Sequence, residues 1–199
     1  MPISSGGEII KIRKGKLTKL KEEGINPYPY SFKITHDLSQ IKKLFSNLSL
    51  EEISTAGRII SIRKMGKASF IHIKQAKEKL QLYFKKDLLG EKAYKYFETL
   101  DIGDFIGITG TPFITKTGEL TLKVKKFSLL SKSIRPLPEK WHGLKDVEIR
   151  YRQRYLDILA NDKIMEIFIL RTKIIKTIKK FIDEREFLEV KTPMMQPIP

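Results

Sequence analysis

A chain of 199 residues is long enough for one large domain, or for one domain and part of another. Its hydrophobic content of 41% can supply a core, whereas the absence of cysteine excludes disulfides and thiolate zinc sites. The formal net charge of +16 favours a polyanion such as nucleic acid as a partner, although a solvated lysine-rich face or a biased genomic composition explains it equally well.

The positive charge is concentrated in the N-terminal part of the chain. Residues 1–144 hold 27 Lys+Arg against 14 Asp+Glu, and the remainder holds 12 against 9. No apolar run has the length of a membrane span, the N-terminus lacks a signal-peptide core, and the three isolated histidines lack the spacing of metal ligands. These features predict a cytoplasmic protein without a membrane partner and without a histidine metal site.

Residues 1–50 are expected to form a helical extension. A lysine-rich helix is predicted over residues 8–23, with Ile9, Ile12, Leu17 and Leu20 on one side and Gly24 at its end. A short helix is predicted from Asp37. The prolines of segment 26–30 keep the chain between the two helices extended, because each restricts the residue before it.

Residues 51–132 change to a period of two, which is typical of strands. Three strands, a helix and two more strands are expected over residues 54–63, 69–74, 79–84, 88–100, 105–114 and 119–126. This is the order of a five-stranded OB-fold barrel, which binds oligonucleotides on the face of its second and third strands. The predicted fold class is therefore mainly β with helices.

Alternation also predicts which side chains leave the barrel. In the first strand it places Ile60 and Ile62 on one face, and Ile59 on the other face with Arg63. The outer face is then expected to carry Arg63, Phe70, His72, Gln81, Tyr83 and Glu119. Aromatic rings beside a cation, an amide and a carboxylate suit unpaired bases. Because a carboxylate lowers the affinity of a surface that binds only phosphates, Glu119 indicates base reading.

Packing is the competing explanation for these residues. Outward rings often lie under a helix or a loop, and Glu119 also fits a turn-flanking position without a role. Function is favoured for Phe70. Packing is favoured for His72 and Tyr83, which stay secondary RNA-binding candidates.

Residues 133–144 are expected to form a proline-stiffened linker, and residues 145–199 the start of a second domain. A helix over residues 150–159 should precede a long helix that begins at Asn161 or Asp162. The long helix has an apolar stripe of Ile164, Ile167, Phe168, Ile174, Ile175, Ile178, Phe181 and Ile182. A strand is expected from Phe187 until Pro193 stops it.

Several segments resemble one family. The run EIRYRQRYLDIL at 148–159 is similar to the segment that joins the anticodon-binding and catalytic domains of class II lysine–tRNA ligases. Successive signatures of the bacterial-type enzymes resemble MGKASF at 65–70, LQLY at 80–83, TKTGEL at 115–120 and RPLP at 135–138. The long helix and the segment after it are similar to motif 1 of class II synthetases.

The resemblance implies a function and roles for particular residues. It implies that Arg63, Phe70, Gln81 and Glu119 contact the uridine-rich anticodon of lysine tRNA, and that Pro193 lies in a homodimer interface. The family forms lysyl-adenylate from lysine and ATP, with Mg²⁺, and then charges the tRNA. The turn at 75–78 departs from the family, because it reads QAKE where Asp-x-x-Gly is usual.

The later motifs of the family, which hold ATP, Mg²⁺ and lysine, are not found in this sequence. No catalytic residue and no cofactor is therefore assigned to the chain, which is expected to be a fragment that cannot aminoacylate tRNA alone. Two alternatives remain open. One is a free-standing OB-fold protein that binds tRNA or single strands without catalysis, and the other is an aspartate- or asparagine-type synthetase, against which segment 150–157 argues.

Overall fold

The computed structural model describes residues 4–48, 51–66, 68–137, 144 and 146–191. The chain divides into two compact units, Met1–Leu137 and Pro138–Pro199. Most of the predicted linker, at 138–143, lies outside the described residues. Within the described ranges, no helix combines the length and the apolar character that crossing a membrane requires.

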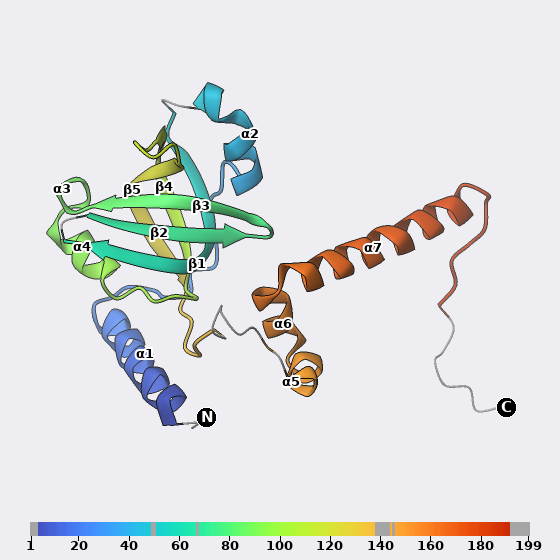
Figure 1. The fold of residues 1–199 in the computed structure, drawn as a ribbon, viewed down its shortest axis with the longest axis horizontal. Helices are drawn as coiled ribbons and strands as arrows, with labels where there is room; N and C mark the ends of the chain where they lie inside the picture. The colour runs from blue at the N-terminus through green and yellow to red at the C-terminus, as the bar shows by residue number, and fades with distance from the viewer. Residues whose placement is uncertain (1–3, 49–50, 67, 138–143, 145, 192–199) are drawn as a thin grey trace. The chain divides into compact units, whose positions relative to one another are not determined.

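Five strands of the first unit form a closed barrel (Figure 1). They are β1 (Ile53–Met65), β2 (Ala68–Gln75), β3 (Glu78–Lys85), β4 (Phe105–Ile114) and β5 (Leu120–Ser131). Their order around the barrel is β1-β2-β3-β5-β4, with β3 and β5 parallel and the other pairs antiparallel. This arrangement confirms the predicted OB-fold barrel and the fold class.

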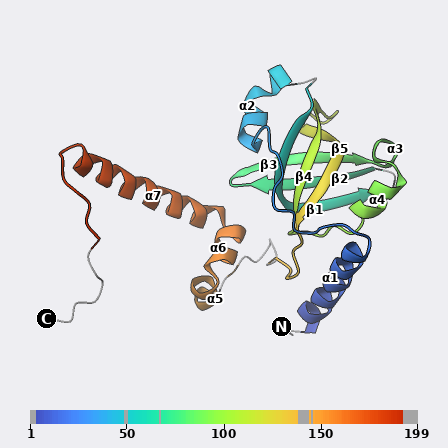
Figure 2. The ribbon, with the colours of Figure 1, turned by 180° about the vertical axis from the view of Figure 1, so that it is seen from behind.

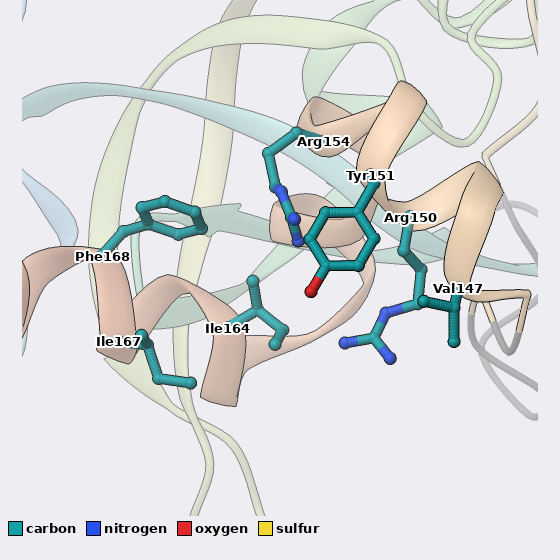
Figure 3. A pocket seen from close by; sticks show the side chains of 7 residues that line it. All are labelled: Val147, Arg150, Tyr151, Arg154, Ile164, Ile167 and Phe168. Carbon is teal, nitrogen blue, oxygen red and sulfur yellow. The ribbon is translucent and has the colours of Figure 1, made fainter.

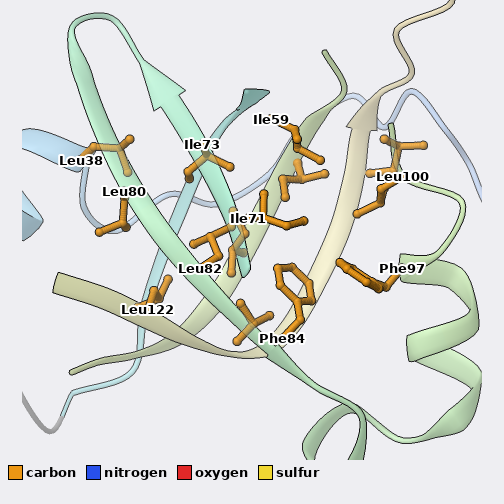
Figure 4. Close-up of a cluster of buried hydrophobic side chains, with 14 of the residues drawn as sticks. Leu38, Ile59, Ile71, Ile73, Leu80, Leu82, Phe84, Phe97, Leu100 and Leu122 are labelled. Carbon is orange, nitrogen blue, oxygen red and sulfur yellow. The ribbon is translucent and has the colours of Figure 1, made fainter. Parts of the chain in front are cut away.

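Side chains that alternate with outward-pointing ones along each strand fill the barrel interior (Figure 4). At most 2% of the surface is exposed for Ile71, Ile73, Leu80, Leu82, Phe84, Leu122 and Val124. Phe84 stacks on Phe97 of the following helix, with ring centroids 4.7 Å apart. Since each such side chain contributes about 1.5–3 kcal/mol by leaving water, this core fixes which face of each strand points outward.

A β-bulge in β1 corrects the predicted alternation of that strand. Ile59 pairs with Ile73, but the next pair joins Ser61 to His72, so Ile60 is an extra residue in β1. Ile59 is consequently buried in the core, and the prediction that it shares a face with Arg63 is wrong. Beyond the bulge the alternation holds, because Arg63 pairs with Phe70 on the outside of the barrel.

Two short helices replace the single helix predicted over residues 88–100. They are α3 (Lys86–Leu89) and α4 (Glu91–Phe97). Gly90 separates them with a φ of +81°, a conformation that interrupts a right-handed helix and that glycine adopts without strain. The amide of Gly90 still bonds to Lys86, so the first helix ends there.

The hairpin between β2 and β3 contacts α2 (Leu38–Leu48). Gln75 and Glu78 pair around a two-residue turn, in which Ala76 has a φ of +51°. The Gln75 side-chain oxygen accepts a hydrogen bond of 2.9 Å from the Leu38 amide, which is a free donor in the first turn of α2. The QAKE turn thus serves as a cap for α2, and the outer residues of β3 keep a regular register with β2.

Charged side chains attach α1 (Ser4–Glu22) to the barrel. Figures 1 and 2 show α1 and α2 at different ends of the barrel. Arg13 donates to the backbone oxygens of Ser133 and Ile102, and Lys16 donates to Asp101 at 2.6 Å. Leu20 is buried, whereas Ile9 and Ile12 of the predicted apolar side are exposed. The helix is therefore held by polar contacts at its middle more than by a continuous apolar stripe.

The described part of the second unit contains three helices, α5 (Val147–Arg152), α6 (Arg154–Ala160) and α7 (Asp162–Asp183). The single helix predicted over residues 150–159 is divided, because Gln153 has non-helical angles (φ −116°, ψ 56°). Asp157 is 1% exposed and accepts from Arg150 at 3.0 Å and from Arg154 at 2.7 Å. These bonds tie α6 to α5 across the break.

The strand predicted from Phe187 is absent from the described part of that segment, because residues 187–191 have no regular structure. A strand needs the backbone of a neighbouring strand as its hydrogen-bonding partner. All described strands pair within the barrel of the first unit, and none is available to this segment. Pro193 lies outside the described residues.

The buried ion pair at the end of β5 generates a stability prediction. Lys132 is 4% exposed, and its ammonium contacts Asp101 at 2.6 Å and the fully buried Asp104 at 2.7 Å. Lys132→Met should lower the free energy of unfolding by roughly 3–5 kcal/mol, since it leaves the buried carboxylate without a cation. Urea denaturation followed by circular dichroism measures the loss. Lys125→Met is the control and should lose at most about 1 kcal/mol, because Lys125 pairs with Glu52 on the exposed surface. Equal losses would contradict the buried role of Lys132.

The same cluster predicts an acid-sensitive contribution to stability. Burial alone would raise the pKa of Asp101, but hydrogen bonds from Lys132 and Lys16 outweigh it and hold the pKa below the ordinary value of 3.8. The folded carboxyl binds a proton more weakly than the unfolded one, so its contribution is present above about pH 4 and is lost as the pH falls through the folded pKa. Urea titrations between about pH 5 and pH 3 should therefore show a shallower decline in Asp101→Asn than in the unaltered chain. Identical pH slopes would refute this.

Candidate nucleic-acid interface

The outer face of the barrel carries two rows of directly paired residues. The first row runs across β1, β2, β3, β5 and β4 as Ser61, His72, Gln81, Thr121 and Phe113. The second row follows the same strands as Arg63, Phe70, Tyr83, Lys123 and Thr111. Paired residues on neighbouring strands project to the same side of a sheet, so both rows lie on one continuous surface.

A hydrogen-bonded network connects the first row. The Ser61 hydroxyl lies 3.0 Å from His72 Nδ1, and His72 Nε2 lies 3.0 Å from Glu119 Oε1. Gln81 Nε2 donates to the other Glu119 oxygen at 2.7 Å. The Thr121 hydroxyl donates to Gln81 Oε1 at 2.7 Å, which directs the amide nitrogen of Gln81 toward the carboxylate. The network thus joins side chains of four strands and one loop.

Glu119 comes from the loop between β4 and β5. The loop is closed by Thr115. Its amide donates to the backbone oxygen of Glu119 at 3.0 Å, and its hydroxyl accepts from the backbone amide of Glu119 at 3.0 Å. Gly118 takes a φ of +80° in this turn, a value that glycine adopts readily. The side chain of Glu119 is 48% exposed, so solvent or a ligand can reach its carboxylate despite its two partners.

Aromatic rings form a diagonal band across both rows. The Phe70 and Tyr83 centroids are 5.2 Å apart, and those of Tyr83 and Phe113 are 6.1 Å apart in an edge arrangement. All three rings are half-buried. Their remaining exposed surface lies beside the Gln81 amide and the Glu119 carboxylate that binds it. Single-stranded bases use rings for stacking and such polar groups for edge contacts.

Two cations flank the aromatic band. Arg63 is exposed at the β1 end of the second row, and among the described residues none forms a hydrogen bond or ion pair with it. Lys123 is exposed on β5, with its ammonium 5.9 Å from the Phe113 centroid. A guanidinium and an ammonium at these places can bind phosphates beside stacked bases.

The structure brings together all six candidates of the first domain: Arg63, Phe70, His72, Gln81, Tyr83 and Glu119. Five further members of the two rows, Ser61, Thr121, Phe113, Lys123 and Thr111, had not been singled out. Alternation and strand pairing could have identified them, because each pairs with a candidate or with a residue that itself pairs with one. His72 and Tyr83, for which packing was favoured, contact Glu119 and Phe70 respectively.

The second unit contains a pocket of about 440 Å³ (Figure 3). It is lined by Val147, Arg150, Tyr151, Arg154, Ile164, Ile167 and Phe168. The guanidinium of Arg154 lies 4.5 Å from the Tyr151 centroid, and both pocket arginines bind Asp157. The pocket walls are therefore apolar surface and arginines that already have a carboxylate partner. In the described part of the chain no group of His, Asp or Glu side chains could hold a metal ion.

Comparison with known proteins assigns both units to protein families. A family model for the OB-fold nucleic acid binding domain matches residues 53–130, which span the barrel. A model for class II tRNA synthetases (D, K and N) matches residues 146–199.

Curated relatives agree with these matches. The chain is 51% identical over 191 residues to a lysine–tRNA ligase from Carboxydothermus hydrogenoformans and 46% identical over 198 residues to one from Moorella thermoacetica. It is 45% identical to a lysine–tRNA ligase from Shouchella clausii. These alignments cover 96–100% of the chain but only 39–40% of each relative, so the chain spans about two-fifths of the length of the proteins it matches. Residues 53–130 therefore belong to the OB-fold nucleic acid binding domains, and residues 146–199 to the class II tRNA synthetases of the D, K and N group.

Proposed function

We propose that the two rows of the outer face read the anticodon loop of lysine tRNA, as part of a lysine–tRNA ligase. The observation that carries the proposal is the position of Glu119, an accessible carboxylate held beside exposed aromatic surface in a chain of net charge +16. A surface that attracted only phosphates would be weakened by this charge. The carboxylate is useful where a base presents an N–H donor.

The uracil base supplies complementary groups for this surface. Its N3–H donor suits Glu119, and its carbonyl oxygens suit the donors of Gln81 and Arg63. Phe70 offers a ring on which a base can stack, a contact worth roughly 1–3 kcal/mol in single-strand binders. Tyr83 supports Phe70 from the neighbouring strand, at a centroid distance of 5.2 Å. These roles favour a loop rich in uridine over one rich in cytidine.

The parent protein would form lysyl-adenylate from lysine and ATP, with Mg²⁺, and transfer lysine to the tRNA in the cytoplasm. The names and identities of the curated relatives support this activity for a protein longer than the chain. The chain spans about two-fifths of the length of these relatives, and the residues assigned to a site in it are the tRNA-binding candidates of the barrel. The contribution of this chain is therefore recognition of the tRNA.

A homodimer is proposed for the parent protein, with α7 and Pro193 at the interface. None of the residues of α7 is buried in the second unit, and its apolar side chains are 36–58% exposed from Ile167 to Ile182. A continuous apolar face of this kind is stable in water only when another surface covers it.

Binding to anticodon stem-loops tests the reading function. The 199-residue chain should bind a UUU stem-loop more tightly than a GUC stem-loop at two salt concentrations. Phe70→Ala should weaken binding of the UUU loop about tenfold or more by removing the stacking ring. Tyr30→Ala is the matched control, since it removes a fully exposed ring that belongs to neither row. Equal and strongly salt-dependent binding of both loops would reduce the assignment to a general basic OB-fold.

A second pair of variants separates base reading from overall charge. Glu119→Gln and Glu52→Gln each remove one negative charge from a side chain that is 48% exposed. Glu119 is bound to His72, and Glu52 to Lys125. Both should strengthen nonspecific binding slightly, because the net charge rises equally. Only Glu119→Gln should reduce the preference for UUU, by about tenfold. The same loss in Glu52→Gln, measured by fluorescence anisotropy, would show that charge alone sets the preference.

The proposed interface predicts self-association through α7. The 199-residue chain should show a concentration-dependent mass in sedimentation velocity, and Ile178→Glu should shift it to the monomer because a charge is placed in the apolar face. Lys176→Glu alters a charged position on the same helix and should leave association almost unchanged. A chain that stays monomeric at all concentrations would argue against α7 as an interface.

A further inference from the structure

We infer that His72 is a positioning residue that aims the Glu119 carboxylate, so that the discrimination between uracil and cytosine depends on a residue that does not itself need to touch the base. The inference rests on the proposed function of the outer face and names the origin of its selectivity. Nothing in the relatives' names assigns a role to this histidine.

The imidazole is fixed on both of its nitrogens. Nε2 lies 3.0 Å from Glu119 Oε1, and Nδ1 lies 3.0 Å from the Ser61 hydroxyl. An ionised carboxylate only accepts hydrogen bonds, so Nε2 carries a proton toward it. In the neutral ring Nδ1 then accepts the Ser61 hydroxyl proton, and this second bond keeps the ring in the tautomer and orientation that Glu119 requires.

Strand pairing determines where the imidazole lies. Ser61, His72 and Gln81 are direct partners across β1, β2 and β3, so their positions follow from the backbone register. Glu119 differs, because it extends from a loop. The backbone of that loop is closed through Thr115, but the direction of the carboxylate depends on its side-chain partners.

His72 and Gln81 hold opposite oxygens of the carboxylate. Gln81 donates to Oε2 at 2.7 Å, and His72 contacts Oε1. The torsion about the Cγ–Cδ bond of a glutamate is broad, so one partner alone does not fix the plane of the carboxylate. With both partners present, its orientation is set before any ligand binds, and the ordering of the side chain does not oppose binding.

The orientation matters because uracil and cytosine differ at N3 and at the neighbouring group on C4, which is a carbonyl oxygen in uracil and an amino donor in cytosine. Uracil presents an N3–H donor, whereas cytosine has an unprotonated acceptor nitrogen at the same place. Each carboxylate oxygen of Glu119 keeps a lone pair beyond the one that its protein partner uses. A carboxylate fixed toward N3 therefore accepts from uracil and repels the N3 lone pair of cytosine, while a rotating one can turn to the amino group of cytosine and tolerate both bases.

Substitutions of His72 test the inference in the 199-residue chain. The ligands are the UUU stem-loop and three loops in which one uridine at a time is replaced by cytidine. The position with the largest wild-type ratio of dissociation constants, cytidine over uridine, provides the readout. His72→Ala should lower this ratio about tenfold, the size expected for the loss of one hydrogen bond to a charged group.

Two amide variants separate the two nitrogens of the ring. His72→Gln can place an NH₂ donor near the position of Nε2 and should restore most of the ratio. His72→Asn is shorter, approaches only the position of Nδ1, and should stay as poor as His72→Ala. Ser61→Ala should lower the ratio by a smaller factor, because the ring loses the partner that fixes its tautomer.

The outcomes distinguish this inference from the proposed function. If the unaltered chain shows no preference for uridine, the proposed function fails and the inference fails with it. If Glu119→Gln lowers the ratio but His72→Ala does not, the reading function stands and the positioning role is wrong. A His72→Ala chain that binds all loops equally more weakly, with a lowered melting temperature and an unchanged ratio, would identify His72 as a purely structural residue and overturn the inference.

Discussion

The pairing register of the closed barrel is the constraint on which the candidate interface depends. Side chains alternate along a strand, so a shift of one residue would move a whole set of outward groups into the core. The isoleucines of β2 and the leucines of β3 are almost fully buried, and they prevent such a shift. The parallel pairing of β3 with β5 then places Gln81 beside Thr121 and Tyr83 beside Lys123. Core packing thus positions the outer face.

Affinity and selectivity have separate physical origins on this surface. The excess of basic residues provides a long-range attraction for any polyanion, and salt weakens that attraction. Glu119 opposes the attraction locally, so in the proposed interface its role is discrimination. Its two hydrogen-bond donors offset part of the desolvation that a bound base would impose on the carboxylate. A buried cation would hold the carboxylate as firmly, but would take up the lone pairs that a base needs.

The sequence predicts those parts of the fold that follow from local alternation, and it fails where a single irregularity changes the geometry. Phe70, Gln81 and Tyr83 lie in regular stretches of β2 and β3, so a period of two suffices to place them on one face. Ile59 is misplaced because alternation gives no sign of the bulge beside it. The break at Gly90 was detectable from the residue type, whereas the break at Gln153 was not.

Partners of side chains are harder to predict than faces. The Ser61–His72 and Thr121–Gln81 contacts depend on which strands are neighbours, and the β3–β5 pair joins segments separated by two helices and β4. Strand order in a recognised OB-fold supplies that information, but the hydrophobic period does not. For the same reason the segment after Phe187 reads as a strand in sequence, although the described part of the chain provides no neighbouring strand for it.

The charged residues of the run at 148–159 bind one another within the fold. Two of its three arginines, Arg150 and Arg154, are bound to the nearly fully buried Asp157, and Arg154 also lies over Tyr151. Removing one partner of such a group leaves an uncompensated charge, so the positions constrain one another strongly. A signature can thus identify a family through the requirements of folding, without contacting a substrate. The apolar side chains of α7 from Ile167 to Ile182 stay 36–58% exposed among the described residues. Within the described part of this unit, internal contacts explain the charged residues of the signature, whereas the apolar face of α7 is left exposed.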